Sequence, residues 1–458
     1  MKILNYLNAS ELTNEIRKNS LSLNIIFICT LILPFSLYLG PAIIELLIFL
    51  ICVSYLYIIT SKKEKIYFNN LILFFLSFYV LLILSSLLSN YILISLKSSL
   101  LSIRFAILTF AIIHILKKTN CFLKFFFISS FLCIALLFLS GLSQFLFSED
   151  YWVVNELKNI GVAQSLRHPL KNTIITGFFA EEKKLGSFIA RLSPLIIGLY
   201  FFISKNEMRK KINSALLYFA PLFLIGFFTG ERMAMIYLSI TLFFLLIFSI
   251  KNNKKNIYKL IIFLMIPFIL FFANINQFQL LVKNSYDQFY SSGSINYPSE
   301  QHRVFAITSI KLFKNNLILG IGPNNYRRKC NEISSDIFFR KGVRNTIKIG
   351  MDSGHTYDHT NIRNCSTHPH NIFFQLLSEI GLLGIIYYAI FNIFLFVQII
   401  KFFFKKDYNQ ISFFFLLPVI YYLNPIFPAG NFFNNWYMCF GILGVPFYLY
   451  LARIKKSD

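Results

Sequence analysis

Runs of about 20 apolar residues, each long enough to cross a lipid bilayer as a helix, recur along this 458-residue chain from Leu21 almost to the C-terminus. The composition agrees with this pattern, because 56% of the residues are hydrophobic, 14% are charged and the mean hydropathy is +0.62. These values exclude an ordinary soluble globular protein. We therefore expect an all-α polytopic membrane protein.

The apolar pattern predicts twelve membrane-spanning helices. They cover residues 21–38, 41–60, 70–89, 98–116, 122–147, 186–204, 212–229, 233–250, 257–274, 379–400, 411–423 and 433–452. The first run lacks a small-residue cleavage site at its end, so we expect a membrane span rather than a cleaved signal peptide. Amphipathic helices are expected in one large extracytoplasmic loop.

Lysine and arginine set the predicted orientation. They gather in alternate connections, at residues 62–65, 117–124, 205–211, 251–259, 401–406 and 453–456. Because basic connections stay in the cytoplasm, both termini are expected inside and the two long loops outside, at the inner membrane of a bacterium. The chain then divides into a cytoplasmic segment (1–20), helices 1–5 (21–147), an extracytoplasmic loop (148–185), helices 6–9 (186–274), a large periplasmic loop (275–370), helices 10–12 (371–452) and a cytoplasmic tail (453–458).

The large loop carries twelve basic and six acidic side chains, a net charge of +6. This excess fits either a solvated surface that attracts anionic lipid headgroups or a binding site for a phosphate or pyrophosphate. Within the loop, residues 299–315 have the pattern of an amphipathic helix at the membrane surface, with Ser299 as its N-cap. The breaker sequence LGIGPNN, residues 319–325, ends this helix.

Two of the seven cysteines, Cys330 and Cys365, share the large loop, whereas the other five lie in or beside predicted spans. In an oxidising compartment the two are free to form a disulfide. The alternative is a metal site, because His355, His359, Cys365, His368 and His370 lie within sixteen residues. Their spacing is not a standard zinc signature, so we expect no metal and no other cofactor.

Four segments carry a family resemblance. They are GFFAEEKKLGSFIARLSPL (177–195), FTGERMAM (228–235), HRVFAITSIKLFKNNLILGIGPNNY (302–326) and HPHNIFFQLLSEIGLLG (368–384). Together they resemble the O-antigen ligase and O-antigen polymerase superfamily of bacterial membrane glycosyltransferases. The last segment is the most specific, since it matches the family's His-Asn pair followed by Glu-x-Gly-x-x-Gly. Leu317-Ile318 departs from the family at a position where proline is common.

The resemblance implies transfer of a glycan, with inversion and without a metal, from an undecaprenyl-pyrophosphate carrier to a hydroxyl acceptor such as lipid A-core. Arg232 and Arg303 are the candidates to stabilise charge on the pyrophosphate leaving group, because arginine's planar fork suits phosphate oxygens. The alternatives are that Arg232 snorkels to the interface or pairs with Glu231, and that Arg303 lies on the polar face of its helix. Arg191 contacts substrate or is structural.

His370 is the candidate general base for the attacking hydroxyl. Pro369 predicts an early helical position, whose positive end would keep this imidazole neutral. Asn371 is expected to hold His370 or a substrate hydroxyl, and His368 to contact substrate or to be a surface histidine. Glu379 lies within a helix and is expected to have a buried partner, as structural support.

A flippase or secondary transporter is the competing class. Such a protein predicts internal repeats and many ionisable residues near the bilayer midplane. Intramembrane charges are sparse here, at Glu45, Arg104 and Arg191, and polar residues gather in one outer loop. An enzyme is therefore favoured. An O-antigen ligase, a polysaccharide polymerase and a protein O-oligosaccharyltransferase share these signatures, and the intact His-Asn and Glu-x-Gly motif favours the ligase.

Overall fold

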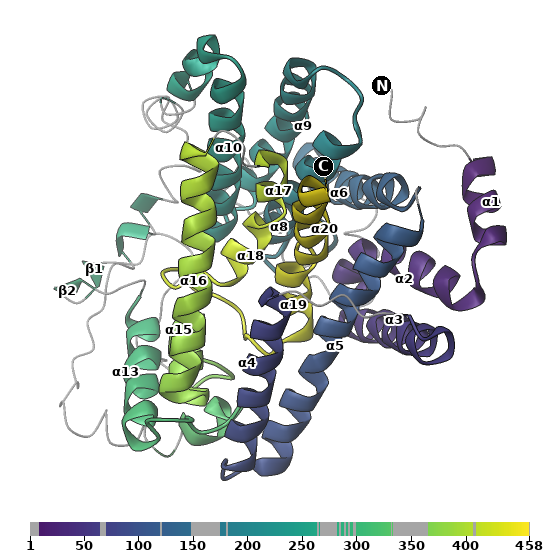
Figure 1. The fold of residues 1–458 in the computed structure, drawn as a ribbon. Coiled ribbons are helices and arrows are strands. Elements are labelled where there is room, and N and C mark those ends of the chain that lie inside the picture. Colours follow the sequence, from purple (N-terminus) through teal and green to yellow (C-terminus); the bar gives the residue numbers. More distant parts are fainter. Residues whose placement is uncertain are drawn as a thin grey trace.

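The chain was analysed as a computed structural model, which describes residues 9–64, 70–119, 121–147, 175–179, 182–262, 265, 282–283, 285–287, 290–291, 294–295, 299–330, 332, 365–405 and 409–457. Within these residues, eight helices are long and apolar enough to cross a membrane. They are α2 (Leu21–Leu39), α3 (Pro41–Lys62), α5 (Ile92–Lys118), α6 (Phe122–Phe147), α8 (Leu185–Ile203), α9 (Met208–Phe228), α10 (Arg232–Asn252) and α16 (Gly381–Phe404). The predicted all-α polytopic class is confirmed (Figure 1).

The other predicted spans differ in form. The third is the shorter apolar helix α4 (Asn70–Leu87), and most of the ninth, 257–274, lies outside the described residues. The last two are each broken, into α17 (Gln410–Phe414) and α18 (Leu417–Tyr422), and into α19 (Asn435–Ile442) and α20 (Val445–Ser457). The breaks pack together, because a Cβ on Gly444 would lie 2.0 Å from the carbonyl oxygen of Phe415. The count of twelve spans stays a prediction.

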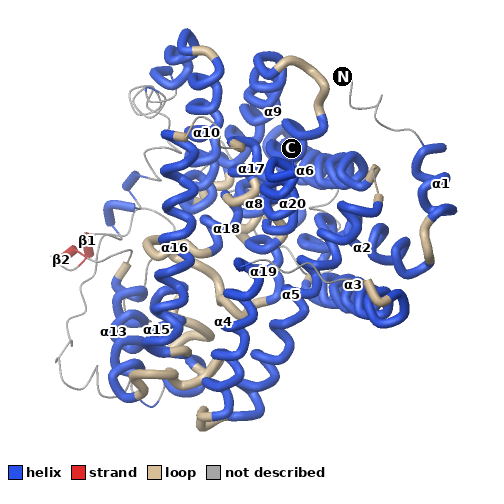
Figure 2. The backbone as a smooth tube through the Cα atoms, viewed as in Figure 1, coloured by secondary structure: helices blue, strands red, loops and turns tan. Residues whose placement is uncertain are grey.

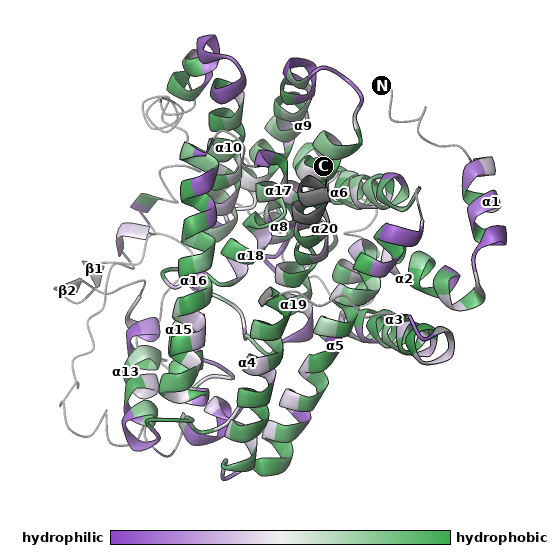
Figure 3. Cartoon of the chain, in the orientation of Figure 1, coloured by the Kyte–Doolittle hydropathy of each residue, from purple (hydrophilic) through white to green (hydrophobic). Residues whose placement is uncertain are grey.

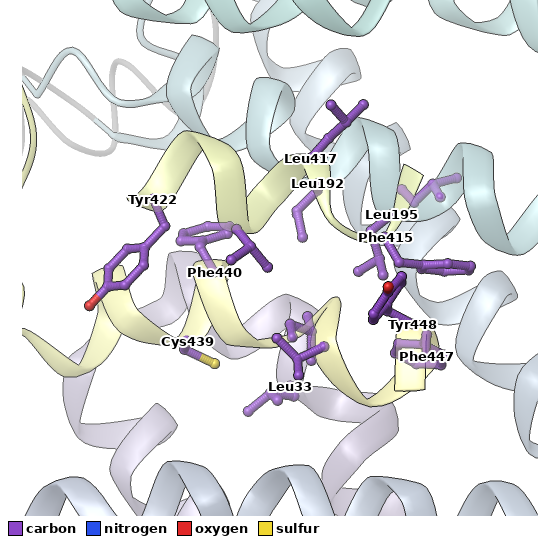
Figure 4. Close-up of a cluster of buried hydrophobic side chains, with 14 of the residues drawn as sticks. Leu33, Leu192, Leu195, Phe415, Leu417, Tyr422, Cys439, Phe440, Phe447 and Tyr448 are labelled. Carbon is purple, nitrogen blue, oxygen red and sulfur yellow. The ribbon is translucent and has the colours of Figure 1, made fainter. Parts of the chain in front are cut away.

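Helix α8 lies at the centre of the bundle, against α6, α9, α10, α17 and α18. Its side chains are buried on nearly every side, as expected for a helix that is apolar all round. Leu192 and Leu195 of α8 pack with Phe415 and Phe447 from the broken helices (Figure 4). This core fixes α17 to α20 relative to the long helices.

Apolar side chains also cover the outside of the bundle. Phe49 on α3, Leu93 on α5 and Phe396 on α16 are 63%, 84% and 61% exposed. Figure 3 shows hydrophobic residues along the length of α4, α5 and α16, and hydrophilic residues at the upper ends of α9 and α10. Such a surface suits hydrocarbon, because lipid tails are as apolar as the side chains they meet.

The remaining elements are short or lie at the edges. Helix α1 is Ala9–Lys18, the 3₁₀ turns η4 and η5 are Gly177–Phe179 and Lys254–Asn256, and the strands β1 (Tyr290–Ser291) and β2 (Ser294–Ile295) pair antiparallel. Helix α13 (Glu300–Asn315) lies beside α15 (Ile372–Glu379). The predicted N-cap is confirmed, because the Ser299 side chain accepts the backbone N–H of His302.

The two glycine motifs of the sequence meet each other. The turn after α13 lies against the junction of α15 and α16, where the N–H of Gly322 donates to the carbonyl of Glu379 at 2.9 Å and the N–H of Leu382 donates to that of Leu317 at 2.8 Å. Gly320 and Gly381 have φ of +66° and +71°, and a Cβ on either would come within 2.6 Å of backbone atoms of the other segment. Only glycine combines this conformation with so close a contact.

Serines at the ends of α4 and α5 hold the same turn from the other side. Ser85, Ser89 and Ser95 donate their hydroxyls to the carbonyls of Leu319, Ile321 and Pro323 at 2.6, 2.7 and 3.0 Å. Backbone groups that leave regular structure inside a membrane protein require such partners. The turn is thereby fixed to three helices, α4, α5 and α15.

Replacing Gly381 with alanine tests this contact. The change adds backbone strain of about 1–3 kcal/mol at a positive φ, and the new Cβ also meets the backbone of Ile318 and Gly320, which costs a further ~1–3 kcal/mol. Gly40→Ala is the matched control, because Gly40 has φ +131° with no atom within 4 Å of the added Cβ. Thermal unfolding in detergent should show a larger loss for Gly381→Ala, and equal losses would contradict a close backbone contact.

Candidate functional site

Three histidines cluster where α13 meets the segment before α15. The ring centroid of His370 lies 4.1 Å from that of His368 and 5.9 Å from that of His302, and the Phe305 ring stacks on His370 at 5.5 Å. His368 is 8% exposed, and His302 and His370 are half-buried. The three imidazoles thus form one cluster, with the Phe305 ring packed against it.

His370 is held by its backbone and by one hydroxyl. Its φ of +55° is in the left-handed region, its carbonyl accepts the N–H of Ala429 at 2.8 Å, and its Nε2 lies 3.1 Å from Ser366 Oγ. Non-glycine residues in this conformation are uncommon and concentrate at functional sites. The local backbone therefore sets the direction of the imidazole.

Helix α15 begins after this histidine. The Asn371 side chain caps it by accepting the N–H of Phe374 at 3.2 Å and also donates to the carbonyl of Pro425 at 2.9 Å. The expected helical position of Pro369 is therefore wrong, since the helix starts at Ile372. Asparagine is a stronger start signal than proline here, because its side chain satisfies an otherwise unpaired N–H.

Burial keeps the cluster neutral. It lowers the pKa of His302 to about 4 and that of His368 to about 3, with the neighbouring His370 acting in the same direction on both. Burial also lowers the pKa of His370. The positive charge of Arg232 also lowers the pKa of His302. Arg232, the first residue of α10, is therefore near enough to act on this histidine. At neutral pH these rings are bases.

A buried polar chain lies beside the histidines. Glu379 is fully buried, and its Oε1 accepts the N–H of Tyr326 at 2.9 Å while its Oε2 accepts from Gln375 Nε2 at 3.0 Å. Gln375 Nε2 also donates to Asn431 Oδ1 at 2.7 Å, and its Oε1 accepts the N–H of Phe432 at 2.8 Å. Burial raises the pKa of Glu379 to about 7. These contacts join the turn, α15 and the connection between α18 and α19 (Figure 2).

A second polar cluster joins α8 and α10. Glu231 turns its carboxylate toward α8, where it accepts the N–H of Gly186 at 2.7 Å and the hydroxyl of Ser187 at 2.5 Å. Arg191, 8% exposed, donates to the Ser187 carbonyl and lies between the rings of Tyr237 and Tyr437, 5.4 and 5.2 Å from their centroids. Burial raises the pKa of Glu231, and the charge of Arg191 opposes this.

One short segment contacts both clusters. Ala429 donates to the carbonyl of His370, and Asn431 binds Gln375. Between them, Gly430 lies against the Tyr437 ring, with a Cβ there 3.1 Å away. The histidines and the Arg191 cluster are therefore neighbours across residues 429–431.

Cys330 and Cys365 form a disulfide across a sequence separation of 35 residues. Cys330 packs with Leu312, Ile321 and Tyr326, and Cys365 precedes the Ser366 that contacts His370. The disulfide thus closes the large loop beside the cluster. His355 and His359 lie outside the described residues, and among those described no group of three or more His, Cys, Asp or Glu is arranged to hold a metal ion.

The structure brings together His368, His370, Asn371 and, through His302, Arg232. It leaves the Arg303 side chain exposed on α13, one residue from the inward-facing His302. Sequence reasoning missed His302, although that residue opens the third family segment and follows the Ser299 cap. Packing against other segments decides which face of an amphipathic helix is turned inward. The sequence pattern alone therefore did not decide whether His302 or Arg303 faces the site.

Residues 217–389 match the family model described as O-antigen ligase. This segment belongs to the O-antigen ligase superfamily. It contains Arg232, the three histidines, the disulfide and Glu379, whereas Arg191 and Ser187 lie before it. The match supports a membrane enzyme of the O-antigen ligase or polymerase type. No curated protein matches the chain at a significant level of similarity.

The Glu379 carboxylate should be needed for assembly of the site. Glu379→Ala leaves the buried N–H of Tyr326 without its acceptor and removes one of the two acceptors of the Gln375 amide, which costs about 1–3 kcal/mol for each donor left unpaired. Glu379→Gln restores one acceptor only, so its loss should be intermediate. The thermal unfolding midpoints in detergent should rank in that order, with the half-exposed Glu332→Ala as the neutral control. A midpoint for Glu379→Ala equal to wild type would contradict the proposed bridging role.

Proposed function

We propose that the protein transfers a glycan from an undecaprenyl-pyrophosphate carrier to a hydroxyl of lipid A-core, on the periplasmic face of a bacterial inner membrane. The observation that carries the proposal is a cluster of neutral histidines beside Arg232, inside the segment that matches the O-antigen ligase model. The alternating basic connections support cytoplasmic termini and a periplasmic site.

His370 acts as the general base. Its Nε2, which contacts Ser366 Oγ, takes the proton of the acceptor hydroxyl as the hydroxyl oxygen attacks the anomeric carbon. The bond from that carbon to the carrier pyrophosphate breaks on the opposite side, and the pyrophosphate leaves with the bonding electrons. The configuration at the anomeric carbon is therefore inverted. A half-buried imidazole whose pKa is lowered by burial suits this role at neutral pH.

The leaving group needs positive charge. Arg232 opens α10 close to His302, and Arg303 lies on the first turn of α13, so both can bind pyrophosphate oxygens that approach the histidines from outside. Arg191, Asn371 and His368 contact the substrate in this scheme. No metal is required in this scheme, because the arginines carry the charge; activity should persist in EDTA.

The same chemistry serves a polysaccharide polymerase and a protein O-oligosaccharyltransferase, which differ only in the acceptor. Deleting the gene separates the three. A ligase predicts loss of capped lipopolysaccharide with accumulation of carrier-linked polymer. Single-repeat caps would indicate a polymerase, and unchanged lipopolysaccharide with lost protein glycosylation would indicate the third. Carrier-linked glycan that fails to reach the outer face would favour a flippase.

His370→Ala and Arg232→Ala should each reduce glycan transfer below one hundredth of wild type, because general-base catalysis contributes about 10²–10⁴-fold and one charge-stabilising donor about 10²–10³-fold. Transfer is measured as capped acceptor on gels, and protein level by immunoblot. Lys314→Ala, an exposed basic residue at the far end of α13, is the matched control. Near-normal transfer by either variant would remove that residue from the mechanism.

The acid limb of the pH profile should lie lower than for an ordinary histidine. Since burial lowers the pKa of His370 from 6.5, the ring stays an unprotonated base as the pH falls to 6.5, and transfer declines only below that value. The single-turnover rate of purified protein, measured between pH 4.5 and 8, gives the midpoint. A midpoint above 6.5 would be inconsistent with a buried base; recovery on return to pH 7 excludes unfolding.

A further inference from the structure

The nitrogen that acts as general base in the proposed function already has a partner. Ser366 Oγ lies 3.1 Å from His370 Nε2, within reach for proton transfer. An imidazole nitrogen that acts as a base carries no proton and offers a single lone pair. The Ser366 hydroxyl is therefore the donor in this contact, and it occupies the position that the acceptor hydroxyl must take.

The imidazole of His370 is confined by its neighbours. The Phe305 ring stacks on it with the two planes 25° apart, and the His368 ring lies 4.1 Å away. The backbone of His370 is fixed at a φ of +55° by the hydrogen bond from Ala429. Since the ring keeps its direction, an acceptor reaches Nε2 only when the serine moves.

Ser366 has a fixed backbone and a movable side chain. Its carbonyl oxygen lies 3.7 Å from Cys330 Sγ and 3.9 Å from Cys365 Sγ, so its backbone packs against the disulfide. Among the residues that the structure describes, His370 is the one hydrogen-bond partner of its hydroxyl. A serine side chain has one torsion, χ1, with three staggered positions. Rotation about χ1 alone can therefore uncover Nε2.

We propose that Ser366 covers the general base until an acceptor hydroxyl displaces it, so that water does not take the acceptor's place. The inference rests on the proposed function, which uses His370 Nε2 as the base. Binding of the acceptor supplies the free energy for the displacement, as in induced fit, where the correct substrate completes the site. A water molecule makes too few contacts to do the same. Ser366 is thus a residue that selects between transfer and hydrolysis.

The reaction that Ser366 suppresses is hydrolysis of the donor. In this reaction a water oxygen bonds to the anomeric carbon, and the water proton goes to His370 Nε2. The bond from that carbon to the pyrophosphate breaks, and its electron pair leaves with the pyrophosphate oxygen. The products are a free reducing glycan and the carrier pyrophosphate. Exclusion of water from an active site prevents side reactions of this kind.

Removing the hydroxyl tests the proposal. The full chain in lipid nanodiscs receives undecaprenyl-pyrophosphate-linked glycan without acceptor, and the release of reducing glycan is measured. Ser366→Ala should raise this release about tenfold or more, since an open general base contributes about 10²–10⁴-fold. With lipid A-core added, it should lower the apparent acceptor KM about two- to tenfold, because no hydrogen bond has to be displaced. Ser366→Thr, which keeps a hydroxyl, should hydrolyse the donor as slowly as wild type.

Two further variants exclude a general loosening of the site. Thr367→Ala removes the neighbouring hydroxyl, which contacts His368 Nδ1 at 2.9 Å, and should leave hydrolysis unchanged. The double variant Ser366→Ala, His370→Ala should lose the added hydrolysis, because the base is absent. Equal hydrolysis by Ser366→Ala and wild type would overturn the inference, as would the same rise in Thr367→Ala. A fall in kcat without hydrolysis would also overturn it, because Ser366 would then orient His370 during turnover.

Acylation by diethyl pyrocarbonate tests the covered nitrogen without any glycan. The reagent attacks unprotonated imidazole, so His370 should react about threefold faster or more in Ser366→Ala than in wild type at pH 7, with His368 as the internal reference in mass spectrometry. Equal rates would overturn the inference. Faster acylation in a protein that transfers no glycan would remove the proposed function and keep Ser366 as the cover of His370. Ser366→Gly makes the same comparisons if Ser366→Ala does not fold.

Discussion

The close backbone contact between the turn at residues 317–323 and the start of α16 is the constraint on which the site depends. Two glycines with positive φ let the segments approach, and inter-segment hydrogen bonds then fix their register. Glu379 sits at this contact and accepts from Tyr326. Through that carboxylate, the position of α13, and with it His302, is tied to the helix that follows His370.

This arrangement places a fully buried carboxylate and a carboxamide chain inside an otherwise apolar bundle. Such groups are costly to bury unless every lone pair and proton has a partner. Here Glu379, Gln375 and Asn431 satisfy one another and two backbone N–H groups. The polar chain therefore favours one geometry, because a packing that breaks one of these hydrogen bonds leaves a buried polar group unpaired.

The sequence predicted the fold class, the membrane helices and the helix at 299–315 because each depends on local periodicity and capping. Its His370 and Glu379 assignments came from a motif that is itself local. It did not predict the proximity of His302 to His370, or the turn of Glu231 toward Ser187, because these contacts join residues far apart in the chain. The breaks at Phe415 and Gly444 also went unseen, since each is stabilised by the other and neither is marked by hydropathy.

The disulfide between Cys330 and Cys365 has a consequence for variation within the loop that it closes. Both ends of that loop are held at one place, beside Ser366 and the core of Leu312 and Tyr326. The entropic cost of lengthening a closed loop grows only slowly with its length. A change of length between the two cysteines is therefore expected to cost little and need not displace the histidines.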